Sequence, residues 1–339
     1  MSFEVVARSL TQIGTTLVLI LLAFALVEAI IFVFYNKVLK VGDKSLTAML
    51  LAPAIIGLVL LIVVPLIYEV VLSFSNMNLH HFKDPSFGLG IFFANMKRVF
   101  TTKILKTMTF WPLLFQTVLW TVIQVTFHVV LGLMLALILN SNIKLKGLYK
   151  AILILPWAMP PVISGLTWRG EFHAKYGFFN IILTKVFGDQ AALPWMTDSF
   201  WNFVAMNITN IWMGVPFMMI ICLGALQGVP IEYYEAAAMD GAGKSHRLFN
   251  LTIPLIKPVL APSVMLGIIW TFNNFNVPYF INQFMLETSD ILVTALYRAA
   301  FTYNQYGFAA AFALVIFFIL FGISVVYMKK TGALKAIGD

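Results

Sequence analysis

The sequence predicts an all-α, polytopic membrane protein with about seven transmembrane helices. Of its 339 residues, 61% are hydrophobic and 11% are charged, whereas soluble domains are about half apolar and about a quarter charged. One soluble core of this length could not bury 31 Phe, 16 Met and 8 Trp residues. Seven apolar runs are long enough to cross a hydrocarbon layer about 30 Å thick. Together these observations exclude an ordinary water-soluble enzyme.

Each apolar run is interpreted as one membrane span. The first continues past Ala23 and Ala25, which resemble a signal-peptide cleavage site, so we expect a retained helix. The fourth is kept as a span although Pro156, Pro160 and Pro161 interrupt it, since an interior proline removes a helix hydrogen bond. The runs are Ile13 to Tyr35, Leu50 to Phe74, Leu113 to Leu139, Ala151 to Trp168, Phe200 to Leu226, Val259 to Ile281 and Tyr306 to Met328.

Basic residues lie between the runs and predict the orientation of the chain. Twelve of them follow runs one, three, five and seven, against ten on the other side. The positive-inside rule therefore places those four segments in the cytoplasm, the N-terminus outside and the C-terminus inside. The net charge of +8 is spread between spans, so it does not indicate nucleic-acid binding. The twelve are Lys37, Lys40, Lys44, Lys144, Lys146, Lys150, Lys244, Arg247, Lys257, Lys329, Lys330 and Lys335.

No catalytic or cofactor motif is predicted for this chain. Gly243-Lys244-Ser245 ends like a phosphate-binding loop, but Ala238 stands where that motif needs its first glycine. The residues before it, 230–240, predict a helix instead of the required strand. The single cysteine, Cys222, excludes an intrachain disulfide and a multi-cysteine metal site. We find no serine triad, no paired catalytic carboxylates and no metal-spaced histidine cluster, so the chain is predicted to bind no cofactor or metal.

The segment between runs five and six predicts a compact knob of two short helices. They span 230–240 and about 244–250, meet at Gly241 and Gly243, and are followed by Pro254 and Pro258. Exposed small and aromatic residues favour a docking element for a partner protein. A solvated amphipathic loop is the plainer alternative.

Glu235-Ala236-Ala237, followed by Gly241 and by Leu251-Thr-Ile-Pro254, resembles the EAA loop of ABC importer permeases. From about Leu50 onward the order of spans is similar to the larger permease subunit of maltose-type sugar importers. Further similar stretches are 154–160, 212–216 and 272–275. The resemblance implies a type I importer fold, with an extra N-terminal helix and linker in 1–45 and a six-helix core in 46–339. Within that core, 75–112 is an extracytoplasmic loop, without the large insertion of the maltose subunit, and 227–258 is the cytoplasmic coupling loop.

The resemblance also implies partners and a division of labour. Two permease subunits form one pathway in the inner membrane, and two cytoplasmic ATPase subunits bind ATP and Mg²⁺. An extracytoplasmic solute-binding protein delivers an oligosaccharide. The residues implied to couple this chain to the ATPase are Glu235, Ala236, Ala237, Asp240 and Gly241.

Aromatic and amide side chains within the spans predict where a sugar binds. Sugars have flat C–H faces and hydroxyls, so their sites combine aromatic rings with amides in an apolar cavity. Asn207 and Asn210 are expected on one helix face, and Trp270 and Asn274 on another. The residue types themselves point to Trp157, Asn210, Phe217, Trp270, Asn273 and Asn274. The resemblance adds Pro161, Met213, Gly214 and Thr271. Several of these residues lack hydroxyls that the maltose subunit has, so the cargo need not be maltose.

Three alternatives remain open at this point. Asparagines and tryptophans within spans can also serve helix packing alone, and His128 is interpreted in this way. An ion-coupled secondary transporter would rely on intramembrane charges such as Glu28 or Glu69. An ABC importer could instead carry glycerol phosphate or uronic-acid oligosaccharides. The spans contain no lysine or arginine, which disfavours a strongly anionic cargo.

Overall fold

The computed structural model describes residues 3–38 and 43–331. Within these residues the chain is helical and forms no β-strand, apart from isolated bridges between Ser75 and Phe87 and between Lys103 and Thr109. The predicted all-α class is therefore confirmed. Two of the basic residues used for the orientation, Lys40 and Lys335, lie outside the described residues.

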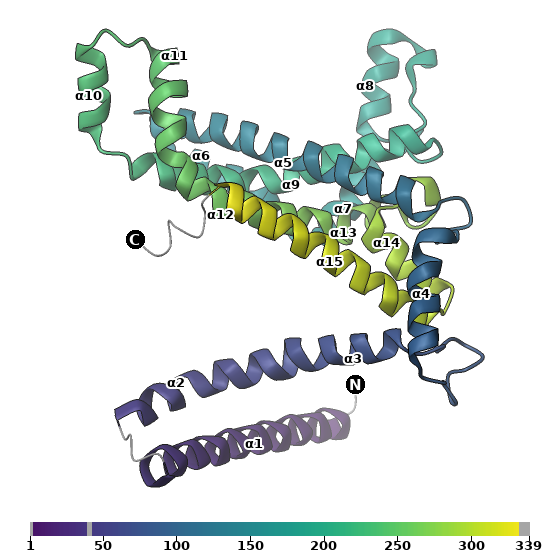
Figure 1. Cartoon of the computed structure of the whole chain (residues 1–339). Helices are drawn as coiled ribbons and strands as arrows, with labels where there is room; N and C mark the ends of the chain where they lie inside the picture. Colours follow the sequence, from purple (N-terminus) through teal and green to yellow (C-terminus); the bar gives the residue numbers. More distant parts are fainter. Residues whose placement is uncertain (1–2, 39–42, 332–339) are drawn as a thin grey trace. The chain divides into compact units, whose positions relative to one another are not determined.

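The chain divides into two compact units, Met1–Val71 and Leu72–Asp339. In the first unit, α1 (Phe3–Val33) continues through a π-helical turn (Phe34–Val38), and α2 (Asp43–Leu58) packs beside it in the opposite direction (Figure 1). A second π-helical turn (Val59–Val63) joins α2 to α3 (Val64–Ser73). The first two predicted spans are thus observed as helical stretches Val6–Val38 and Leu46–Ser73. The contacts group the second stretch with α1.

The second unit holds the remaining helices. The predicted knob is observed as α10 and α11, and the segment predicted as an extracytoplasmic loop contains the helix α4. In chain order these helices are α4 (Leu89–Thr101), α5 (Phe110–Asn140), α6 (Lys146–Ala158), α7 (Pro161–Glu171), α8 (Phe178–Phe187), α9 (Ser199–Gln227), α10 (Ile231–Met239), α11 (Lys244–Arg247), α12 (Ile253–Phe272), α13 (Asn276–Asn282), α14 (Leu292–Tyr297) and α15 (Tyr306–Thr331). Among the described residues, six helical stretches are long and apolar enough to span a membrane, or seven if the bent pair α6–α7 counts as one.

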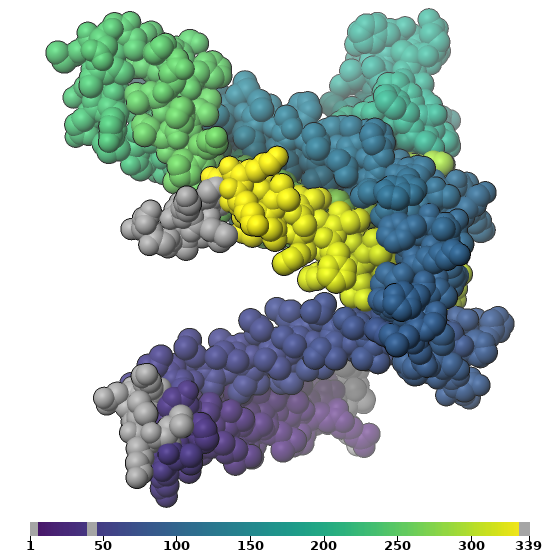
Figure 2. Space-filling view, viewed as in Figure 1, coloured from purple at the N-terminus to yellow at the C-terminus, as the bar shows by residue number. Residues whose placement is uncertain are grey.

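Helices α5 and α9 form the most extensive helix pair of the second unit and approach closely. A Cβ atom on Gly132 would lie 2.9 Å from Cβ of Met218, so glycine is what permits this approach. The α10–α11 segment projects from one end of the long helices and α8 from the other, as separate lobes in the space-filling view (Figures 1 and 2). We call these the α10 end and the α8 end of the unit.

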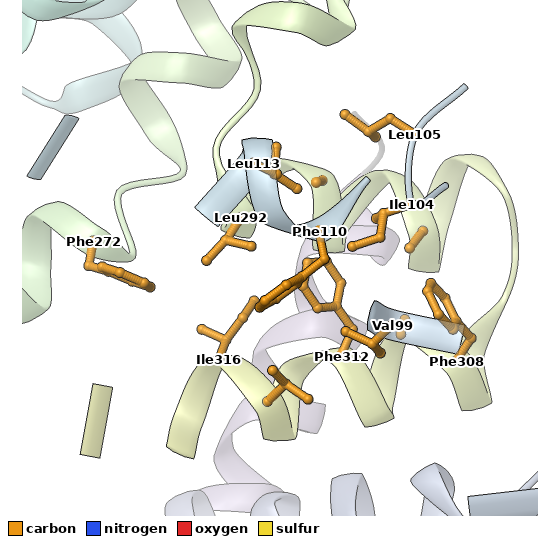
Figure 3. Packing of buried hydrophobic residues seen from close by; sticks show 14 of the residues in the cluster. Val99, Ile104, Leu105, Phe110, Leu113, Phe272, Leu292, Phe308, Phe312 and Ile316 are labelled. Atoms are coloured by element: carbon orange, nitrogen blue, oxygen red, sulfur yellow. The ribbon is translucent and has the colours of Figure 1, made fainter. Parts of the chain in front are cut away.

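A hydrophobic cluster fixes the helices near the α8 end. Phe110 and Leu113 at the start of α5 meet Phe312 and Ile316 of α15, and Val99 of α4 completes the contact (Figure 3). Phe110 and Phe312 pack edge to face with ring centroids 6.3 Å apart. The cluster therefore joins three helices that are far apart in sequence.

Two predicted spans are not continuous straight helices. The fourth is broken after Met159, where α6 and α7 meet at an angle of 91°, because Pro160 and Pro161 cannot continue the hydrogen-bond ladder of α6. The sixth ends at Phe272, and an irregular turn at 273–275 separates α12 from α13. Trp270 and Asn274 consequently do not share one continuous helix, contrary to the spacing argument. Both breaks open the backbone at the same depth of the unit, where a cavity lies.

Candidate functional site

A cavity of about 490 Å³ lies where α5, α6, α7, α9, α12 and α13 meet. All ten residues predicted for substrate binding line it: Trp157, Pro161, Asn210, Met213, Gly214, Phe217, Trp270, Thr271, Asn273 and Asn274. The lining also includes His128, Met218, Gly267, Ile269 and the segment 275–277, none of which the sequence argument selected as a site residue. The structure thus brings together side chains from six separate helices.

Three aromatic rings form one wall of the cavity. Phe217 of α9 stands between Trp157 of α6 and Trp270 of α12, with ring centroids 5.8 Å and 5.2 Å apart respectively. The two tryptophans are 49% and 51% exposed in the isolated chain. The rings therefore form an apolar platform that is covered on one side only.

Amide groups form a neighbouring part of the lining. Nδ2 of Asn274 donates to Oδ1 of Asn210 over 2.7 Å, and Oδ1 of Asn274 accepts from the backbone N–H of Val277 over 3.2 Å. Asn274 therefore links α9 to the turn between α12 and α13. Asn207, which was predicted to share the face of Asn210, instead accepts from Gln124 of α5 over 2.9 Å and does not line the cavity.

His128 and Gly214 make a close contact between α5 and α9 beside the cavity. Nε2 of His128 lies 3.1 Å from the backbone oxygen of Asn210, and the side chain is almost fully buried. A Cβ atom on Gly214 would lie 2.2 Å from that nitrogen. His128 is thus a hydrogen-bonded packing residue, as expected, but it also faces the cavity. Its position as a polar residue in mid-span was the signal for this second role.

Thr271 and Trp120 connect the cavity to the protein interior. The indole nitrogen of Trp120 donates to the backbone oxygen of Thr271 over 3.0 Å, and the Trp120 side chain is completely buried. The Thr271 oxygen also accepts from the backbone N–H of Asn274 over 3.1 Å, so the end of α12 is bonded both to α5 and to the turn that follows it. The break that exposes Asn273 and Asn274 is therefore anchored from α5.

The α10–α11 segment presents the residues predicted to couple the chain to an ATPase. Glu235, Ala236, Asp240 and Gly241 are exposed, and Ala237 is half-buried. Gly241 has a φ of +78°, a conformation that side chains other than glycine rarely adopt.

The end of α10 is a Schellman motif. The N–H of Gly241 donates to the oxygen of Ala238, and the N–H of Ala242 donates to that of Ala237, over 3.0 Å and 2.9 Å. Gly241 therefore caps the C-terminal end of α10. Oγ1 of Thr252 lies 3.2 Å from the hydroxyl of Tyr234 and ties α10 to the start of α12. This hydrogen bond consequently fixes α10 relative to the start of α12.

Comparison with known proteins identifies the family. Residues 128–330, which include the whole cavity lining and the α10–α11 segment, match the profile of the binding-protein-dependent transport system inner membrane component. The chain belongs to this family. Its members are membrane-embedded permease subunits of ABC importers and not enzymes, and this chain is accordingly a multi-pass protein of the inner membrane. The alternative of an ion-coupled secondary transporter is thereby rejected.

Two curated relatives cover most of the chain. The galactooligosaccharide transport system permease protein GanP of Bacillus subtilis is 31% identical over 291 residues, which make up 84% of this chain and 69% of the relative. The maltodextrin transport system permease protein MdxF of the same organism is 30% identical over 312 residues, or 88% and 72% of the two chains. The predicted resemblance to sugar importer permeases is confirmed at this level.

A solved structure supports the fold. A chain of a bacterial ABC transporter involved in the import of the acidic polysaccharide alginate superposes with a TM-score of 0.73 at 20% identity. The match covers 86% of this chain and 96% of the other. The importer permease fold predicted from the sequence is therefore the observed one.

Proposed function

We propose that this chain is the transmembrane permease subunit of an ATP-driven importer of neutral oligosaccharides, with maltodextrin-like cargo favoured. The observation that carries the proposal is the cavity, which brings an aromatic cluster centred on Phe217 together with an amide pair centred on Asn210. Rings stack on the C–H faces of sugars, and amides bond their hydroxyls. The ten lining residues named above would contact the cargo. GanP and MdxF, whose names specify oligosaccharide cargo, support this choice.

The charge of the cavity favours a neutral cargo over an acidic one. Its described lining residues include no lysine or arginine, and His128 is the one ionisable side chain among them. An anionic sugar chain would lose its hydration there without a cationic partner from this subunit. Glycerol phosphate and uronic-acid oligosaccharides are therefore disfavoured.

A second permease subunit would complete the pathway. Trp157 and Trp270 are half exposed in the isolated chain although they line the cavity. A partner packed against this open side would bury both rings and enclose the cargo. In the proposed complex this chain forms half of a heterodimer built on residues 46–339, and the helix before residue 46 braces the partner.

The α10–α11 segment would connect the pathway to the energy source. We place Glu235, Ala236, Ala237, Asp240 and Gly241 in a cleft of a cytoplasmic ATPase subunit, two of which bind ATP and Mg²⁺ while this chain binds neither. Closure of the ATPase pair would move α10, which Tyr234 and Thr252 link to the start of α12. Residues of α12 also line the cavity. ATPase binding at α10 and cargo binding in the cavity would therefore act on the same equilibrium between two arrangements of the helices.

The proposed orientation places the α10 end in the cytoplasm. Lys144, Lys244 and Lys330 all lie at that end, as the positive-inside rule requires. The N-terminus is then outside, the C-terminus is cytoplasmic, and an extracytoplasmic binding protein meets the α8 end.

The test of this function is uptake by the reconstituted complex. Proteoliposomes that contain both permeases and the ATPase, together with the binding protein, should accumulate maltotriose only when ATP is present. In the same vesicles Glu235→Ala and Gly241→Ala should lower substrate-stimulated ATP hydrolysis at least about fivefold, since a Cβ at Gly241 strains the left-handed cap by about 1 kcal/mol or more.

Gly243→Ala is the matched control for Gly241→Ala. Gly243 lies two residues away, has no atom within 4 Å of a built Cβ, and has an ordinary φ of −67°. It should retain wild-type hydrolysis. Accumulation of maltotriose without any ATPase subunit, or normal coupling in both loop variants, would contradict the proposal.

A further inference from the structure

A group of aromatic rings leads from the cavity toward the α8 end. Phe275, which lines the cavity, lies 4.8 Å from Tyr297 between ring centroids, and Tyr297 lies 4.8 Å from Phe301. Two further rings, Tyr279 and Phe284, pack beside this line at 4.9 Å from Phe275 and 5.5 Å from Tyr297 respectively. Phe301 is 64% exposed. We call the five rings the aromatic strip; it begins in the cavity and ends at the protein surface.

The turn that carries Phe284 is strained. Gln283 and Phe284 have φ values of +47° and +59°, in the left-handed region that residues with side chains rarely occupy. Nδ2 and Oδ1 of Asn282 clamp the turn by bonding the backbone oxygen and N–H of Leu286 over 2.7 Å and 2.9 Å. Strain of this kind persists only where surrounding contacts enforce it, and such positions gather at functional sites.

Two arginines bond the backbone at this turn and at the end of α13 that precedes it. The Arg298 guanidinium lies 4.1 Å from the ring centroid of Phe284, and its Nη1 donates to the Phe284 backbone oxygen over 3.2 Å. A buried ion pair with Asp290 fixes Arg298 in turn. Nη1 of Arg169 in α7 donates to the oxygen of Ile281 over 2.5 Å. The Phe284 ring is thus held in place by charged groups rather than by apolar packing alone.

We propose that the aromatic strip is a second carbohydrate subsite, over which the pyranose rings of an oligosaccharide pass between the extracytoplasmic face and the cavity. The proposal rests on the function proposed above. The rings of the strip contact one another, with centroids 4.8–5.5 Å apart. The ring surfaces that they leave exposed form one aromatic surface on which C–H faces of sugars can stack. Tyr279 and Tyr297 add hydroxyls, and Asn276 and Gln283 add exposed amides beside the rings. The strip therefore fits a neutral saccharide longer than the cavity holds.

The test distinguishes stacking of sugars on the rings from a role of the rings as apolar side chains that only close the pathway. Tyr297→Leu and Phe301→Leu keep apolar side chains but remove the ring, whereas Tyr297→Phe and Phe301→Tyr keep the ring. In the full reconstituted importer with maltoheptaose as probe, each leucine variant should lower kcat/KM for uptake about three- to tenfold, the effect of losing one stacking contact. The aromatic variants should stay within about twofold. Phe318→Leu on α15, a ring that is also 64% exposed, serves as the matched control and should not change uptake.

The possible outcomes distinguish this proposal from the function on which it rests. Leucine variants that transport maltoheptaose at the wild-type rate would contradict the proposed carbohydrate subsite, while the proposed importer function would stand. Leucine variants that instead raise ATP hydrolysis in the absence of sugar would identify an apolar gate and would also contradict the proposed subsite. A wild-type complex that imports no oligosaccharide at all would overturn the proposed function itself. Thermal unfolding midpoints equal to wild type would show that the variants are folded.

Discussion

A methyl group on Gly214 would lie 2.2 Å from Nε2 of His128 and 2.3 Å from its Cε1. Rotation about a side-chain bond cannot relieve this clash on the alanine side, because the backbone fixes the position of Cβ. Gly214→Ala should therefore displace the buried His128 ring or move α9 away from α5, and either movement breaks the bond between His128 and the oxygen of Asn210. We expect a loss of about 1–3 kcal/mol in the free energy of unfolding, as for other overpacked interiors, together with a higher KM for sugar uptake.

Gly224→Ala provides a matched comparison on the same helix. Gly224 also lies in α9, but no atom is within 4 Å of its built Cβ. Replacing an unhindered helical glycine by alanine stabilises a helix by about 0.5–1 kcal/mol. The thermal unfolding midpoints of the two purified variants should therefore move in opposite directions. Equal midpoints would show that α5 and α9 separate without cost at Gly214.

The cavity residues were largely predictable because their types are unusual where they occur. Trp157, Asn210 and Asn274 are amphipathic or polar residues in or beside apolar helices, so a site is a simple explanation for several of them together. His128 was interpreted as a packing residue alone, although a polar residue in mid-span also indicates a candidate site residue. The segment 275–277 was missed because it lies beyond a helix break whose position the apolar run does not reveal.

At the scale of elements, apolar runs predicted the helices but not their bends. Proline residues indicate where a hydrogen bond is missing, whereas the angle depends on what packs against the free segment. Here α7 turns by 91° and packs on α13. Gly165 of α7 permits this contact, because a Cβ there would lie 2.8 Å from Cβ of Phe280. That pairing joins residues more than a hundred positions apart, which no local pattern could indicate.

The segment between α13 and α15 should make stability depend on pH. Burial raises the pKa of the Asp290 carboxyl from 3.8 to about 6, and the charge and hydrogen bond of Arg298 offset only part of this rise. The folded protein then holds this proton more tightly than the unfolded chain does. The free energy of unfolding should therefore fall by on the order of 2 kcal/mol as pH rises from about 4 to 6, and level off above that.

Asp290→Asn tests this pH dependence. The variant leaves Arg298 buried without its anionic partner, so its stability is lower throughout, but the slope between pH 4 and 6 should be smaller than in the wild type. Asp84→Asn, at an exposed position, should keep the wild-type slope. Thermal unfolding midpoints of the purified complex in detergent measure both. A wild-type slope in Asp290→Asn would assign the titration to another group.

At the scale of the whole molecule, the two ends of the second unit have different tasks. The α10 end carries a projecting helix on a defined support, and the α8 end carries the aromatic strip with its buried charges. The cavity lies between them and contacts both through α12 and the segment that follows it. In the proposed mechanism, a movement of α12 would change both the contact that supports α10 and the turn at 273–275.

This arrangement makes a prediction about sidedness that needs no knowledge of the cargo. With Cys222, a buried residue, replaced by alanine, single cysteines at the exposed positions Lys97, Lys244 and Lys330 should react differently with a membrane-impermeant maleimide. Lys97→Cys, in α4 near the α8 end, should be labelled in intact cells. Lys244→Cys and Lys330→Cys should be labelled only in inverted vesicles, because α11 and the end of α15 lie at the opposite end. Labelling of Lys97→Cys and Lys244→Cys from the same side would contradict the topology, and with it the placement of the coupling segment against a cytoplasmic ATPase.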